Sequence, residues 1–137
     1  DINCVALPST NLYLQGREDT LNIRRGIAPI KQMVEKDIKA FIASDNIRDP
    51  FNPFGNADML EEALTAAHGI QMGGQKELQT LFDMISEIPR KALRFKNTLE
   101  KGVSPRFIII DSISKTDSII TQPELYGYLE DIKLVKK

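Results

Sequence analysis

The sequence contains one cysteine, one histidine and almost no net charge. Its formal charge is −1 at pH 7, and its 18 lysines and arginines are scattered along the chain. That distribution argues against a nucleic-acid-binding face, which needs clustered basic side chains. The lone Cys4 cannot build a disulfide framework, and its apolar neighbours favour a buried strand cysteine in a reducing compartment over a nucleophile. We therefore expect a cytoplasmic protein with no nucleic-acid partner.

Long apolar runs are absent as well. Runs such as "FIII" at 107–110 are too short to span a membrane. The N-terminal "DINCVALPST" lacks a basic stretch followed by a long apolar core, so we expect no signal peptide. The sequence predicts a soluble protein with no membrane partner.

Short apolar and amphipathic segments alternate and predict an α/β fold. With 137 residues the chain can form one core but lacks the length for two full domains. Apolar runs at 2–8 and 38–43 predict two buried strands. A polar loop at 9–26 and a helix at 27–36 are expected between them. Because one helix joins the two strands, we expect them to be adjacent and parallel.

Three more helices are expected further along the chain. Asn56 is a candidate N-cap for a helix that ends at "MGG" (72–74), and the next helix is expected at 76–87. Pro89 is expected to open a short helix that reaches Phe95, since proline is tolerated in a first turn.

Beyond residue 100 the pattern changes to strands. The run "RFIIID" at 106–111 predicts a strand, and residues 127–137 predict a further strand or a hairpin. Residues 101–137 are therefore expected to form a small β appendage. Because two parallel strands make an incomplete sheet, we expect another chain or another copy to cover its edges.

The loop "SDNIRDPFNPFGN" (44–56) is the most informative stretch for function. Asp49 and Asn52 each precede a proline and are therefore biased to extended geometry, while Gly55 permits conformations closed to other residues. Asp45 follows the second predicted strand, where β/α barrels carry catalytic groups. The loop fits either an active-site rim or an ordinary turn in which Asp45 is solvated.

Four segments resemble the cytosine deaminase branch of the amidohydrolase superfamily and the related isopropylammelide hydrolases. They are "NLYLQGREDTLNIRRGI" (11–27), "SDNIRDPFNPFGNADML" (44–60), "AAHGIQMG" (66–73) and "KALRFKNTLEKGVSPRFIIID" (91–111). The resemblance implies the C-terminal third of such an enzyme. Residues 1–100 would form the last two β/α units of a TIM-type barrel, and residues 101–137 would form C-terminal strands of its small β-sandwich.

The resemblance also implies site residues. Asp45 matches the aspartate that binds the catalytic divalent metal, iron or zinc, and accepts a proton from water. Asn46 stands where cytosine deaminases have a substrate-contacting aspartate, and Phe51 where they have a tryptophan beside the substrate ring. Gln15 belongs to the "LQGR" motif near the site rim. We expect Asp49 only to shape the turn before Pro50.

Other parts of the superfamily's site have no counterpart in this sequence. The family's HxH pair, its further metal-binding histidines and its catalytic glutamate are missing. His68 shares a predicted helical face with Leu60 and Leu64, which favours a core or interface residue over a metal ligand. Because catalytic metal sites need about three protein ligands, we expect this chain to bind no metal by itself.

Two functions remain open. In the first, the chain is part of a metal-dependent amidohydrolase that deaminates a cytosine-like or other cyclic amidine. The N-terminal barrel portion, or another copy of the chain, would then complete the site. In the second, the chain is a noncatalytic remnant or a binding module.

Overall fold

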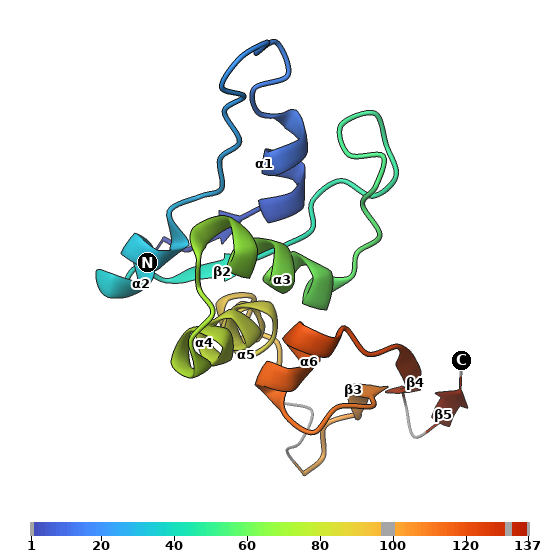
Figure 1. Ribbon diagram of the computed structural model, residues 1–137. Helices are drawn as coiled ribbons and strands as arrows, with labels where there is room; N and C mark the ends of the chain where they lie inside the picture. Colours follow the sequence, from blue (N-terminus) through green and yellow to red (C-terminus); the bar gives the residue numbers. More distant parts are fainter. Residues whose placement is uncertain (1, 97–100, 131–132, 137) are drawn as a thin grey trace.

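The structure, a computed structural model, describes residues 2–96, 101–130 and 133–136 (Figure 1). Two strands, β1 (Cys4–Ala6) and β2 (Ala40–Ile42), pair in parallel. This confirms the predicted adjacency and direction. All three residues of β2 are buried, whereas Val5 of β1 is 47% exposed and the free thiol of Cys4 is partly buried. The expected burial of both faces of the first strand is therefore wrong within this chain, because the face that carries Val5 is left uncovered while Ala6 on the other face is buried.

Helix α1 (Pro8–Leu14) occupies the start of the segment expected to be a polar loop, so that expectation is wrong there. Pro8 ends β1 and opens α1, since its missing N–H is not needed in a first turn and its fixed φ suits a helix. Helix α2 (Ile30–Glu35) is shorter than predicted, because Pro29 lies at its N-cap. The residue before a proline is biased away from helical geometry, which keeps the chain irregular up to that point.

Helix α3 (Met59–Ile70) begins later than predicted, because its N-cap is Asp58 and not Asn56. The Asp58 carboxylate accepts hydrogen bonds from two amides of the first turn, and Asn56 Oδ1 instead accepts a bond from the Asp58 N–H. The helix ends at Gln71, which has a left-handed φ of 56°.

The next two helices follow closely. Helix α4 (Gln75–Ile85) matches the predicted helix at 76–87 and buries Leu78, Leu81 and Met84. Helix α5 (Glu87–Ala92) begins before Pro89 and ends before Phe95, so the short helix exists with shifted bounds. Within the described ranges, no helix is long and apolar enough to cross a membrane.

The C-terminal segment forms an antiparallel sheet and one helix that was not predicted. Strands β3 (Arg106–Ile110), β4 (Leu125–Glu130) and β5 (Lys133–Lys136) pair in the order β3-β4-β5, which confirms a strand and a hairpin. Residues 131, 132 and 137 of the predicted hairpin lie outside the described residues. Helix α6 (Lys115–Thr121) is capped by the Ser114 hydroxyl, which accepts a hydrogen bond from the Asp117 N–H.

One hydrophobic core joins the two segments. Ile119 of α6 is fully buried in the same cluster as Ile42 of β2 and Leu81 of α4. The Gln122 side-chain amide donates a hydrogen bond to the Leu60 carbonyl at 3.1 Å, which ties the end of α6 to α3. The division into residues 1–100 and 101–137 stays a prediction. Residues 97–100, which precede the expected boundary, lie outside the described residues.

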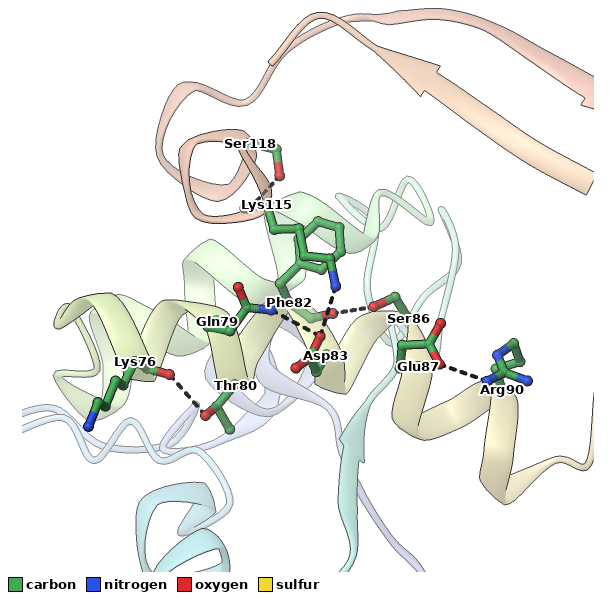
Figure 2. Close-up of polar contacts among 10 residues, drawn as sticks. All are labelled: Lys76, Gln79, Thr80, Phe82, Asp83, Ser86, Glu87, Arg90, Lys115 and Ser118. Atoms are coloured by element: carbon green, nitrogen blue, oxygen red, sulfur yellow. Dashed lines mark hydrogen bonds and ion pairs between the residues drawn. The ribbon is translucent and has the colours of Figure 1, made fainter. Parts of the chain in front are cut away.

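Polar contacts on α4 reinforce the docking of α6 (Figure 2). The Lys115 ammonium lies 3.4 Å from Asp83 Oδ1 and 5.4 Å from the centre of the Phe82 ring. Gln79 Nε2 donates to the same Asp83 oxygen at 3.1 Å. These contacts are at least partly exposed, so they orient α6, while the burial of Ile119 supplies most of the stabilisation.

Candidate active site

Two loops rise on the same side of the strands (Figure 1). The loop at 15–29 follows α1, and the loop at 43–58 follows the carboxyl end of β2. The second loop contains three of the predicted site residues, and the first contains Gln15.

Asp45 lies at the carboxyl end of β2 with its side chain exposed to solvent. Its φ is 61°, in the left-handed region that aspartate tolerates better than most residues. The carbonyl of the preceding Ser44 accepts a hydrogen bond from Thr10 Oγ1 of α1 at 3.3 Å. Among the described residues, no hydrogen bond or ion pair occupies the Asp45 carboxylate. Asp45 is thus held through its backbone, while its carboxylate faces solvent.

Asn46 is held by Asp49. Asn46 Nδ2 donates to Asp49 Oδ2 at 2.5 Å, and Asp49 Oδ1 accepts the amide protons of Phe51 and Asn52, both at 2.9 Å. These hydrogen bonds, with that of the Asn52 amide the largest, hold the pKa of Asp49 below its ordinary value, although slight burial opposes them. Asp49 therefore orients Asn46 as well as shaping the turn, a role that the sequence analysis missed.

Asn52 lies at the centre of the loop and is 1% exposed. Its side-chain amide donates to the hydroxyls of Ser9 and Thr10, both at 3.2 Å. Its side-chain oxygen accepts the Phe54 amide proton at 3.3 Å. The loop is therefore attached to the start of α1 through a buried side chain.

Glu62 of α3 anchors the other end of this network. It is 5% exposed, and it accepts hydrogen bonds from the Ser9 amide at 3.1 Å and from the Ser9 hydroxyl. Burial raises the pKa of Glu62, and the two bonds from Ser9 oppose that rise. Ser9 and Glu62 are 53 positions apart, so no local pattern in the sequence could have paired them.

The two phenylalanines of the loop differ in their contacts. Phe51, the predicted aromatic wall, is 59% exposed, and Phe54 is 75% exposed. The Phe54 ring meets the Tyr13 ring edge-on with centroids 5.6 Å apart, and the Arg17 guanidinium lies 5.1 Å from the Tyr13 centroid. Phe54 therefore connects the loop to α1, although it is the more exposed of the two, whereas Phe51 makes no ring contact among the described residues.

Gln15 ends α1 and belongs to the other loop. Its backbone carbonyl accepts a hydrogen bond from the Arg25 guanidinium, and its side chain lies against Gly26. Arg24 forms two side-chain hydrogen bonds with Asp19, at 2.9 and 2.6 Å. The Arg24 side-chain bonds are also the main cause of a lowered pKa of Asp19. Among the described residues, no hydrogen bond joins Gln15 to the three predicted site residues of the second loop.

His68 is exposed on α3, so it is not a core residue, and its alternative place at an interface stays a prediction. The buried face of the helix runs through Leu60, Ala63, Ala66 and Ala67 and leaves His68 outside it. In the part of the chain that the structure describes, no three His, Cys, Asp or Glu side chains are placed to hold a metal ion. A cavity of about 630 Å³ lies beside α6 and β4, and no residue of the Asp45 loop lines it.

Sequence comparison relates the chain to hydrolases of nitrogen compounds. A sequence model of the Amidohydrolase family matches residues 1–124. N-isopropylammelide isopropyl amidohydrolase of Pseudomonas sp. (strain ADP) is 27% identical over 111 residues, which cover 80% of this chain and 28% of that protein. Pterin deaminase of Rhizobium rhizogenes (strain K84 / ATCC BAA-868) is 38% identical over 71 residues, 49% of this chain and 16% of that protein.

Solved structures show the same relationship. The 5-methylcytosine deaminase from Klebsiella pneumoniae with bound 5-fluorocytosine superposes with a TM-score of 0.87 and 25% identity over 99% of this chain and 33% of that chain. N-isopropylammelide isopropylaminohydrolase from Burkholderia multivorans ATCC 17616 superposes with a TM-score of 0.70 over 81% of this chain and 29% of that chain. At 17% identity, the second likeness shows the fold alone. The chain spans a third or less of these relatives.

Proposed function

We propose that this chain, which belongs to the Amidohydrolase family, forms part of an enzyme that hydrolyses a carbon–nitrogen bond of an N-heterocycle. The resemblance to cytosine deaminase-like amidohydrolases is confirmed by the family match and by the named relatives. Residues 1–100 would supply the last two β/α units of a TIM-type barrel, and residues 101–137 part of its β-sandwich. The mixed α/β structure and its likeness to amidohydrolases support this assignment.

The placement of Asp45 is the observation on which the proposal rests. Barrel enzymes carry their reacting groups just past the carboxyl ends of parallel strands, and Asp45 lies shortly after Ile42, the last residue of β2, with a solvent-facing carboxylate. The hydrogen bond from Thr10 to the Ser44 carbonyl holds the backbone next to Asp45, which favours a site residue over a freely moving turn.

The donor chemistry of Asp45 fits a divalent ion, iron or zinc, as one ligand of a larger set. The other ligands would come from further barrel strands, on the same chain or on another copy. Among the described strands β1 pairs only with β2, so its other edge is open to a further barrel strand, and the exposed Val5 leaves one face of the sheet to be covered. When bound, the ion would lower the pKa of a water molecule toward neutrality.

Asp45 would act on the attacking water, and Asn46, Phe51 and Gln15 would bind or border the substrate. A carboxylate oxygen of Asp45 would accept a proton from the attacking water. The Asn46 amide, oriented by Asp49, would hydrogen-bond a cytosine-like ring or another cyclic amidine. Phe51 would pack on the ring face, and Gln15 would lie at the rim.

The substitution Asp45→Asn tests this proposal. The assay uses the whole protein as its own cell produces it, loaded with zinc or iron. We expect turnover of cyclic amidines to fall by about 10²–10⁴-fold, because the side-chain amide of the variant cannot accept a proton from the attacking water. Asp37→Asn is a matched control, since Asp37 is also exposed and has a similar φ of 54° but lies in the turn before β2. Thermal melts would check that both variants fold.

Two results would contradict the proposal. If Asp45→Asn kept more than about a tenth of wild-type turnover, Asp45 would not be the proton acceptor. If the metal-loaded wild-type protein turned over no cyclic amidine, the noncatalytic alternative would be favoured.

A further inference from the structure

The hydrogen bonds around Asn52 have a fixed direction. Its side-chain NH₂ can only donate, and it donates to two hydroxyls, those of Ser9 and Thr10. Each hydroxyl accepts from Asn52 and donates its own proton onward, Ser9 to Glu62 and Thr10 to the Ser44 carbonyl. The Phe54 amide, which donates to Asn52 Oδ1, fixes which end of the side chain is the donor.

One branch of this network ends at Asp45. The Ser44 carbonyl belongs to the peptide bond whose nitrogen is that of Asp45, so the Thr10 hydroxyl sets the plane of that peptide. The direction of the Asp45 carboxylate depends on that plane. Thr10 is 3% exposed and Asn52 is 1% exposed, so water does not compete for these bonds.

A second branch ends at Asn46. The Asn52 backbone amide donates to Asp49 Oδ1, and Asp49 Oδ2 accepts the Asn46 side-chain proton. The Asn52 carbonyl also accepts the amide protons of Asp49 and Gly55 at 3.3 Å, which closes the loop around it. The buried Asn52 is therefore linked to both Asp45 and Asn46, which follow the end of β2.

We propose that Asn52 positions the site through two separate branches. Thr10 holds Asp45 for proton transfer, and Asp49 holds Asn46 for substrate binding. This inference rests on the proposed function of Asp45 and Asn46. Thr10, Asp49 and Asn52 are positioning residues, because they act through the residues that would touch water and substrate.

The two branches predict effects on different kinetic constants, kcat for the Thr10 branch and KM for the Asp49 branch. Thr10→Val keeps the shape of the side chain and removes the hydroxyl, and we expect kcat per metal-loaded site to fall by about 10- to 100-fold with little change in KM. Asp49→Asn should raise KM several-fold and leave kcat nearly unchanged. Thr10→Ser retains the hydroxyl and should restore kcat.

Amide-hydrogen exchange gives a second reading that does not depend on turnover. Exchange at the Asn52 and Phe54 amides, which donate hydrogen bonds inside the loop, should be faster in Thr10→Val than in the wild-type protein, and close to wild-type in Thr10→Ser. Metal content, measured on the same samples, would give the concentration of loaded sites. A role limited to stability would lower the melting temperature and leave kcat and KM of the folded, loaded protein unchanged.

Several results would overturn the proposal. Unchanged exchange in Thr10→Val, or a Thr10→Ser variant as impaired as Thr10→Val, would remove the Thr10 branch. An unchanged KM in Asp49→Asn would refute the Asp49 branch. If Thr10→Val did not fold, this KM would by itself decide whether the proposal stands. A wild-type protein without turnover would instead refute the proposed function, and the exchange rates would then still show whether Thr10 holds the loop.

Discussion

The loop at 15–29 and the loop at 43–58 lie on the same side of the strands, but different contacts hold them. The tip of the first is fastened by the ion pair between Asp19 and Arg24, whose side chains are 14% and 84% exposed. The second is fastened through Asn52, which is 1% exposed. The first therefore depends on charges that salt can screen, and the second on hydrogen bonds that water cannot replace.

This difference is informative about the roles of the loops. Breaking the Asp19–Arg24 pair should cost less, because water can still solvate the exposed arginine, whereas a buried donor left without a partner is expensive. The second loop is held at its centre by a buried side chain, whereas the first packs on the core only near its end, through Ile27 and Ala28. The second loop also contains Asp45, so the more rigid loop is the one proposed to carry the reacting group.

Gly55→Ala is expected to have the largest effect among the variants that separate the two loops. A Cβ at residue 55 would overlap the carbonyl oxygen of Asn46, so the backbone next to Asp45 must move. We expect a loss of about 1–3 kcal/mol in unfolding free energy, measured by urea unfolding, together with a lower kcat. Gly73→Ala is the control, because nothing lies within 4 Å of its Cβ position. Equal stability of the two variants would show that the loop yields easily.

Phe51→Ala should have a smaller effect, confined to substrate binding. Loss of one aromatic face should raise KM by roughly two- to tenfold with kcat unchanged. Phe54→Ala is the matched comparison, because its ring packs against Tyr13 and should affect the melting temperature more than KM. A larger KM effect for Phe54→Ala would reassign the aromatic wall to that residue.

Arg24→Gln should have the smallest effect. We expect a slight drop in melting temperature in low salt that vanishes in high salt, with kcat unchanged. The pKa of Asp19 is lowered in the folded state, so the pair contributes above the ordinary value of 3.8 and its contribution is lost as the pH falls through the lowered pKa. Melts of the wild-type and variant proteins should therefore converge at acidic pH. A difference that persists in high salt would mean that the first loop is also held by buried contacts.

The sequence predicted the parts of the fold that depend on local patterns. The apolar runs around Ala40–Ile42 and Arg106–Ile110 identified strands, and the spacing of Leu78 and Leu81 identified a helix. The start of α1 was missed although Pro8 is a recognisable first-turn residue. Helix α6 was missed although Ser114 and Asp117 have the spacing of an N-terminal cap.

The site was predictable only in part. The residues after β2 carried the resemblance that pointed to Asp45, Asn46 and Phe51, and their functional roles stay predictions. The supporting contacts of Asn52 could not be predicted, because its partners lie far away in the sequence. Thr10 is 42 positions from Asn52, and Ser9 is 43 positions from it. Gly55 was expected to serve an unusual backbone conformation, but its φ lies outside the left-handed region, and it is required because there is no space for a side chain.

The burial of Ile119 among residues of α4 and β2 has a consequence for biosynthesis. A ribosome delivers β2 and α4 well before it delivers α6, so the apolar surface that Ile119 covers stays open during that interval. Hydrophobic surface exposed on a nascent chain is what chaperones bind and what promotes aggregation. The time needed to translate from α4 to the end of α6 therefore sets how long the incomplete core is exposed to other proteins in the cell.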